Sequence, residues 1–218
     1  LKETIPGFHN TRQRYAHFKE AVAQDKAHRA AEAQEEIRFL LENEDLACTL
    51  TDLHQAGKLP LRVTHNDTKI NNVLFSPEDH SALVVIDLDT VMPGLMGHDF
   101  GDAIRFAANR CEEDCPDPGK AGVDMEVFRS FAEGFLEKTA HAMTQAEADT
   151  LAISCFCLTA ELAVRFLGDY LEGDPYFKTL YPEHNLVRTR CQIALAKDML
   201  ARRGEMENII RDCLAQYK

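Results

Sequence analysis

The feature that most constrains the fold of this chain is the spacing of His65, Asp67 and Asn72, followed by an apolar stretch that ends at Asp87. Within residues 73–86, two runs rich in Val, Leu and Ile flank a Ser-Pro-Glu-Asp-His segment of turn-forming composition. This pattern predicts a β-hairpin whose second strand is buried. A hairpin returns the chain to its starting point, so we expect Asp87 to lie beside Asn72. The competing interpretation is an ordinary hairpin whose ends carry turn-forming Asn and Asp residues.

Carboxylate and amide oxygens in this arrangement suit phosphoryl transfer. In that reaction the protein supplies positioning and charge, with one carboxylate at the acceptor hydroxyl and oxygen ligands for Mg²⁺. We expect Asp67 to receive or orient the proton of the hydroxyl, and Asn72 and Asp87 to bind Mg²⁺. Asp89 is expected to support this site as an outer carboxylate or to bind a second metal ion. Lys69 is interpreted as a charge stabiliser for the transferring phosphate, with a solvated loop lysine as the alternative.

Residues 99–101 read Asp-Phe-Gly, which is the magnesium-binding motif of protein kinases. Their position argues against that role here. They follow a Pro-Gly pair at 93–94, which predicts a turn, and they open a predicted helix that continues to residue 106. We therefore expect the hairpin to carry the metal ligands, and Asp99 and Asp102 to act as helix caps or as groups that orient the site.

Size and charge limit the remaining function classes. A chain of 218 residues with 45% hydrophobic residues can bury one sizeable core, so we expect residues 1–218 to form a single domain. The net charge of −12 and the lack of any basic run argue against nucleic-acid binding. No uninterrupted apolar run approaches the length of a membrane span, and Leu1–Thr4 opens no secretory signal. These features predict a cytoplasmic protein without membrane association.

Apolar residues recur at helical spacing through most of the sequence outside the hairpin. Thr11 is the expected cap of the first helix, and Thr144–Glu147 is a capping box that opens a long apolar helix. The predicted fold class is α+β and predominantly helical, with the architecture of the C-terminal lobe of a protein kinase around one small β-hairpin. Besides the helix that begins at Asp99, helices are predicted around residues 15–22, 37–41, 46–53, 128–136, 147–166, 193–200 and 206–214.

The half of a kinase that covers the nucleotide has no counterpart in this pattern. No glycine-rich loop between strands, and no strand lysine with a helix glutamate to pair with it, precedes His65. We expect the N-terminal lobe, and most nucleotide contacts with it, to be absent from these residues. The chain alone should then have negligible phosphotransferase activity. The apolar surface that the lobe would cover is expected to be open to artificial dimer formation.

Five segments, residues 5–11, 65–72, 85–94, 99–106 and 165–177, resemble the aminoglycoside phosphotransferase/choline kinase-like superfamily and, within it, the N-acetylhexosamine 1-kinases. The resemblance implies that the chain takes part in transfer of the γ-phosphate of ATP to the anomeric hydroxyl of N-acetylglucosamine or N-acetylgalactosamine. ATP and Mg²⁺ are the cofactors that it implies. The longer segments make this resemblance more specific than the spacing of the catalytic residues alone.

The same resemblance implies that Phe106, Arg165 and Tyr176 line the sugar pocket. Two of these residues have simpler interpretations. Arg165 could form an intrahelical ion-pair ladder with Glu161 and Asp169, each four residues away, and Phe106 could pack in the core. Two alternatives for the function also stay open. One is a kinase of another small alcohol, such as an aminoglycoside, choline or homoserine, and the other is a kinase-like binding module without catalysis.

Overall fold

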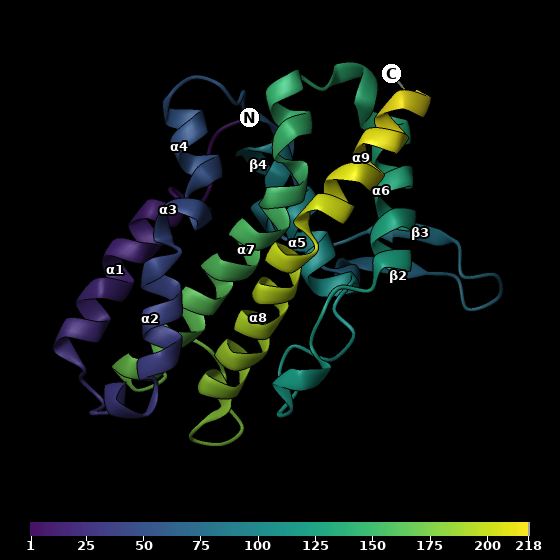
Figure 1. The fold of residues 1–218 in the computed structure, drawn as a ribbon. Helices are drawn as coiled ribbons and strands as arrows, with labels where there is room; N and C mark the ends of the chain where they lie inside the picture. Colours follow the sequence, from purple (N-terminus) through teal and green to yellow (C-terminus); the bar gives the residue numbers. More distant parts are fainter. Residues whose placement is uncertain (218) are drawn as a thin grey trace.

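Helices account for most of the computed structural model, which describes residues 1–217 (Figure 1). Two small sheets accompany them, and the hairpin of β2 and β3 projects from one side of the helical body (Figure 1). This architecture confirms the predominantly helical α+β prediction. The strands are β1 (Arg62–Thr64), β2 (Val73–Phe75), β3 (Ala82–Val85) and β4 (Met92–Gly94). The α-helices are α1 (Thr11–Gln24), α2 (Gln34–Glu42), α3 (Glu44–Ala47), α4 (Thr49–Gln55), α5 (Met96–Ala107), α6 (Met125–Thr139), α7 (Gln145–Glu172), α8 (His184–Ala201) and α9 (Arg203–Tyr217).

Helix α7 lies at the centre of the helical body, with α1, α5 and α8 packed against it (Figure 1). Its start is the predicted capping box. The Thr144 hydroxyl accepts from the N–H of Glu147 at 3.2 Å, and the Glu147 carboxylate accepts from the N–H of Thr144 at 2.8 Å. Gly173 ends the helix with a φ of +92°, a left-handed conformation that glycine adopts without strain. The capping-box prediction is therefore confirmed.

The apolar composition of α7 follows from its place in the core. Within residues 1–217 it is the one helix that is long and apolar enough to cross a membrane, with a mean hydropathy of 1.7 over an 18-residue window. That window is 89% buried inside the protein. A helix that is covered on all sides must be apolar on all sides, so its composition carries no separate indication of a membrane span.

Two apolar clusters share α7. The first joins it to α1, α2 and α8 and includes Phe18, Leu40 and Phe156. The second joins it to α5, α6 and α9, and there the rings of Phe100 and Phe128 meet edge to face with 6.0 Å between their centres. Phe100 is fully buried, so the middle residue of the Asp-Phe-Gly sequence is a core residue that anchors α5.

Both sheets are antiparallel pairs. β1 pairs with β4, with Thr64 opposite Met92, and β2 pairs with β3, with Val73 opposite Val85. The predicted hairpin is confirmed, but the predicted burial of its second strand is wrong, since Leu83 is 63% exposed and all of β3 is exposed. Apolar residues on both faces of a strand predict burial only if another element covers it. Here the helices lie to one side of the hairpin and leave it open (Figure 1).

The Pro-Gly pair at 93–94 lies in strand β4, so the turn predicted there is wrong. A Cβ atom at Gly94 would overlap the side chains of Thr64 and Asn66. The glycine therefore allows the segment after β1 to approach β4 closely, which is a packing requirement rather than a turn.

The N-cap of α1 is Asn10 and not Thr11, which corrects the predicted helix start by one residue. The Asn10 side chain accepts from the N–H of Gln13 at 3.1 Å. The Thr11 hydroxyl is taken up elsewhere, because it donates to the buried carboxylate of Glu161 at 2.6 Å. A cap and a long-range hydrogen bond use the same kind of side chain, and the sequence alone does not distinguish them.

Candidate active site

The loop between β1 and β2, residues 65–72, is held by helix α5; we call it the catalytic loop. The Asp99 carboxylate accepts from the N–H groups of His65 at 2.9 Å and Asn66 at 2.7 Å, and the Thr68 hydroxyl donates to the Asp99 carbonyl oxygen at 2.6 Å. Burial raises the pKa of the Asp99 carboxyl, and the two amide bonds partly oppose that rise. Asp99 thus orients the catalytic loop, as predicted.

Asn66 has a φ of +66°, a left-handed conformation that is uncommon for a residue with a side chain. Its amide nitrogen donates to the carbonyl oxygens of Thr64 at 3.3 Å and Thr90 at 2.9 Å, and its amide oxygen accepts from the Thr64 hydroxyl at 2.9 Å. These bonds hold the backbone just ahead of Asp67. The sequence pattern did not single out Asn66, although an asparagine tolerates positive φ better than most residues and could have been the signal.

Asp67, Lys69 and Asn72 meet within the catalytic loop. Asn72 is buried, and its Nδ2 donates to Oδ2 of Asp67 at 3.0 Å and to the Asp67 carbonyl oxygen at 2.8 Å. Lys69 Nζ lies 3.1 Å from the same Oδ2, so Lys69 is paired with the carboxylate and is not simply a solvated loop lysine. Both contacts use Oδ2. This leaves Oδ1 of Asp67 without a hydrogen-bond partner among the described residues.

The hairpin brings the backbone of Asp87 to the catalytic loop. The N–H of Ile86 donates to the Asn72 carbonyl oxygen at 2.9 Å, and Nε2 of His65 donates to the Ile86 carbonyl oxygen at 3.1 Å. Asp87 follows directly, with a φ of +59°. Its expected proximity to Asn72 is therefore confirmed for the backbone. The carboxylates of Asp87 and Asp89 are exposed and form no hydrogen bond or ion pair within residues 1–217.

The side-chain oxygens at this end of the hairpin are of the kind that Mg²⁺ binds. Because Nδ2 of Asn72 is committed to Asp67, Oδ1 is the amide atom that remains for another partner. Asp87 and Asp89 add carboxylate oxygens. Mg²⁺ prefers hard oxygen ligands and usually keeps water and substrate phosphate oxygens around one or two carboxylates. Through residue 217, no three His, Cys, Asp or Glu side chains are already grouped as a metal site.

A cavity of about 510 Å³ opens beside the catalytic loop; we call it the acceptor cavity. Asp67 and Lys69 line it from the catalytic loop, Phe106 from α5, Arg165 from α7, and Tyr176 from the segment between α7 and α8. The structure therefore brings the predicted catalytic and sugar-binding residues to one space. The three predicted metal ligands do not line this cavity.

The ion-pair ladder considered for Arg165 does not form. Glu161 accepts hydrogen bonds from His9 at 2.8 Å and from Thr11 at 2.6 Å instead, and Asp169 accepts from two backbone N–H groups of the next loop at 2.8 and 3.0 Å. Within residues 1–217 Arg165 has no ion-pair partner. Its guanidinium therefore keeps its donors for a group in the acceptor cavity.

Aromatic rings flank this guanidinium. The Arg165 guanidinium carbon lies 5.8 Å from the ring centre of Tyr176 and 5.3 Å from that of Phe177. Tyr176 is 74% exposed, and Phe106 is half-buried and belongs to neither apolar cluster. The core-packing alternative for Phe106 is therefore wrong. Accessible rings beside free N–H donors can bind a ligand that has both apolar faces and oxygen acceptors.

A comparison with known protein families agrees with this geometry. Residues 2–133 match the model of the phosphotransferase enzyme family, APH. The matched region includes the catalytic loop, the hairpin and α5. Since it spans more than half of the 218 residues, the chain belongs to this phosphotransferase enzyme family, whose members phosphorylate small molecules.

Proposed function

We propose that this chain is the catalytic and acceptor-binding lobe of an ATP-dependent kinase that phosphorylates the anomeric hydroxyl of N-acetylglucosamine or N-acetylgalactosamine. Residues 1–218 act as one lobe, and a further lobe covers the nucleotide. The observation that carries the proposal is the acceptor cavity, where the Asp67 carboxylate shares one space with Arg165 and Tyr176. The proposed enzyme is cytoplasmic and acts on a free sugar, without nucleic acid or a membrane.

Asp67 is the base in this proposal. Its Oδ1 is free to receive the proton of the acceptor hydroxyl, while Oδ2 is fixed by Asn72 and Lys69. Fixing one oxygen orients the other, and correct orientation supplies much of the rate of such a transfer. The Lys69 ammonium stabilises negative charge on the transferring group. Asn72, Asp87 and Asp89 would hold Mg²⁺, which would neutralise charge on the phosphates of ATP.

In this proposal, other residues that line the acceptor cavity recognise the sugar. The unpaired Arg165 guanidinium offers N–H donors to the hydroxyl and acetamido oxygens of an N-acetylhexosamine. The rings of Tyr176 and Phe106 offer apolar faces to the C–H groups of the pyranose. A volume of about 510 Å³ lies within the range of small-molecule sites.

The charges of the acceptor cavity favour a neutral acceptor over a cationic one. Its carboxylates are all paired: Asp67 with Lys69, Asp102 and Glu113 with Arg105, and Glu161 with His9. Three further cations line it without a carboxylate partner in the described part of the chain, namely Arg165, Lys178 and Arg188. Choline and aminoglycosides are cationic, so these three side chains would repel them. Homoserine, which carries a carboxylate, is the second candidate acceptor.

Arg165→Ala should weaken the binding of N-acetylglucosamine to the 218-residue chain by about 10- to 100-fold, because it removes charged hydrogen-bond donors from the cavity. Isothermal titration calorimetry measures the affinity. Arg129→Ala is the matched control, since Arg129 is exposed on α6 and lies outside the cavity. Equal affinity of parent and Arg165→Ala, or tighter binding of choline than of the sugar by the parent, would contradict the proposed acceptor.

Asp87→Ala should weaken Mg²⁺ binding in the presence of ATP by about tenfold or more, because it removes a carboxylate oxygen from the metal site. A magnesium titration followed by calorimetry tests this in the protein that also carries the nucleotide-covering lobe. Asp79→Ala is the control, since it removes an exposed carboxylate from the turn of the same hairpin. Identical titrations for Asp87→Ala and the parent would favour the inert binding module over the kinase.

The open hairpin is part of the same proposal. Leu83, Val84 and Val85 expose their apolar side chains, and a nucleotide-covering lobe packed there would bury them. When that lobe is missing, the face is free to join two copies of the chain in an artificial dimer. The measurement is the molecular mass as a function of protein concentration, with and without the lobe. We expect the mass to rise toward that of a dimer only when the lobe is missing.

A further inference from the structure

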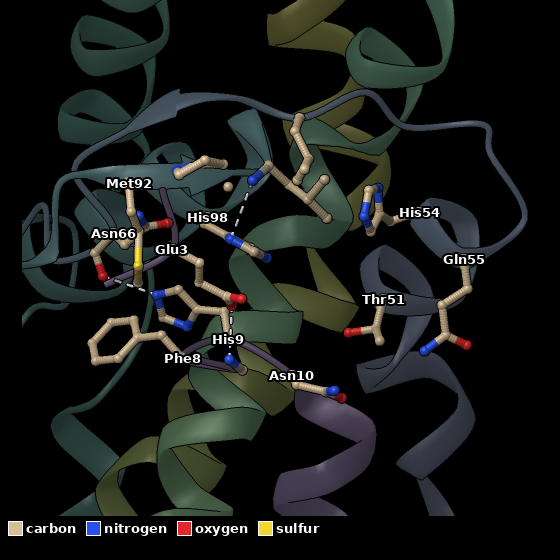
Figure 2. A pocket seen from close by; sticks show the side chains of 15 residues that line it. Glu3, Phe8, His9, Asn10, Thr51, His54, Gln55, Asn66, Met92 and His98 are labelled. Carbon is tan, nitrogen blue, oxygen red and sulfur yellow. Dashed lines mark hydrogen bonds between the residues drawn. The ribbon is translucent and has the colours of Figure 1, made fainter. Parts of the chain in front are cut away.

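His9, in the segment ahead of α1, joins the catalytic loop to the core helix. Its Nε2 lies 2.8 Å from the carbonyl oxygen of Asn66, a contact drawn as a dashed line in Figure 2, and its Nδ1 lies 2.8 Å from Oε1 of Glu161 on α7. The side chains of His9 and Glu161 are only 9% and 3% exposed. These partners are 57 and 152 positions away from His9 in the sequence, so the contacts exist only in the folded chain.

Both partners of the His9 ring are hydrogen-bond acceptors. The Asn66 carbonyl cannot donate, and the Glu161 carboxylate already accepts from the Thr11 hydroxyl at 2.6 Å. A neutral imidazole has a single N–H and would leave its other nitrogen facing an oxygen lone pair. With Glu161 ionised, the two contacts are satisfied together only when both ring nitrogens carry a proton.

The electrostatic surroundings point the same way. Burial lowers the pKa of His9, but the charge and hydrogen bond of Glu161, the hydrogen bond to Asn66 and the charge of Asp102 together outweigh it and raise that pKa. Burial raises the pKa of Glu161, but His9 and the hydrogen bonds bring it down to about 2. Asp99 and Asp102 of α5 add negative charge near His9. His98, whose ring centre lies 4.6 Å away, has its pKa lowered well below the usual value by burial and by His9.

We propose that His9 is a positioning residue for phosphoryl transfer. Its imidazolium, held by Glu161, fixes the Asn66 carbonyl, and the peptide bond that contains this carbonyl leads directly to Asp67. The contact adds to the bonds that the Asn66 side chain and Asp99 make in holding this left-handed backbone. The expected effect on rate rests on the proposed kinase function, whereas the charge of His9 and its hold on the loop do not.

The His9–Glu161 pair should act within a defined pH window. The lowered pKa of Glu161 gives a contribution to stability that is present above its ordinary pKa of 4.5 and is lost as the pH falls toward about 2. The raised pKa of His9 gives a contribution that is present below its ordinary pKa of 6.5 and is lost as the pH rises through the raised value. The contact between His9 and the catalytic loop should therefore weaken as the pH rises through the raised pKa of His9, and kcat should fall over the same range.

Nitrogen NMR of the histidine rings in the 218-residue chain tests the charge without any need for activity. We expect both ring nitrogens of His9 to carry protons at pH 7. Glu161→Gln keeps the shape of the side chain but removes its charge, and there we expect one ring nitrogen to lose its proton at the same pH. A neutral His9 ring in the parent at pH 7 overturns the proposal, whether or not the variant folds.

Kinetics and amide exchange test the positioning. In the two-lobe enzyme, Glu161→Gln should lower kcat about 100-fold with little change in the KM for the sugar, and it should speed amide exchange at residues 65–67. His17→Gln is the matched control, because His17 also pairs with a glutamate of α7, at 3.1 Å, but is 61% exposed. Parental kcat and loop exchange in Glu161→Gln would refute the positioning role. A parent enzyme that transfers no phosphate refutes the kinase proposal instead, and the ring protonation still decides the charge of His9.

Discussion

Replacing Asp67 with asparagine should lower the kcat of sugar phosphorylation by about 10²- to 10⁴-fold. The amide has nearly the same size as the carboxylate but cannot take up the proton of the acceptor hydroxyl at neutral pH. The KM for N-acetylglucosamine should change little, because in the proposed site the sugar is bound by Arg165 and Tyr176, which line the same cavity. The measurement is ADP release at saturating ATP, Mg²⁺ and sugar, in the proposed two-lobe enzyme.

Asp45→Asn is the control for this change. It makes the same replacement at an exposed carboxylate that pairs with Arg12. Loss of the partly exposed contact between Lys69 and Asp67 should alter the free energy of unfolding by at most about 1 kcal/mol, so thermal unfolding can separate lost chemistry from lost fold. If Asp67→Asn keeps more than about a tenth of the parental kcat, Asp67 is not the base.

The parts of the site that depend on short stretches of sequence could be predicted. Asp67 and Asn72 are five residues apart, and their contact is set by the loop that joins them. The pairing of β2 with β3 returns Asp87 to Asn72 because the turn between the strands is short. The capping box of α7 also lies within one helical turn. In each case the spacing along the chain determines which groups can meet.

Contacts between distant residues could not be predicted in the same way. Asp99 holds the catalytic loop from more than 30 residues away, and His9 holds it from 57. The ladder considered for Arg165 had suitable spacing, yet Glu161 and Asp169 are taken by closer donors. A buried carboxylate pairs with the donors that the fold places around it, and the sequence does not state which these are. This is also why the role of His9 becomes visible only in the structure.

Burial of the hairpin was predicted incorrectly for a related reason. The sequence of β3 is apolar on both faces, which indicates that something covers it but does not identify the cover. The Asp-Phe-Gly sequence shows a mixed case, since its structural role was predicted although the turn expected before it is strand β4 and the helix begins earlier, at Met96. Asp99 holds the catalytic loop, and Phe100 lies in the second apolar cluster. Gly101 lies in close contact with Ser154 of α7 and so lets α5 pack tightly on that helix.

Gly101→Ala should lower the free energy of unfolding by about 1–3 kcal/mol. A Cβ at this position would lie 2.5 Å from the carbonyl oxygen of Ser154 and 2.8 Å from its carbonyl carbon. Both are backbone atoms of α7, so neither can move away unless α5 and α7 separate. The higher helix propensity of alanine, about 1 kcal/mol, acts in the opposite direction and should not offset this overlap. Urea unfolding measures the net change.

Gly134→Ala on α6 is the matched control, because nothing lies within 4 Å of a Cβ at Gly134. Only helix propensity acts there, and stability should rise by about 0.5–1 kcal/mol. Asp99 lies two residues before Gly101 on α5, so a displaced α5 should also release the catalytic loop. Binding of N-acetylglucosamine should therefore weaken in Gly101→Ala but not in Gly134→Ala. If both variants instead gain stability and bind the sugar equally, close packing of α5 on α7 is not what holds the catalytic loop in place.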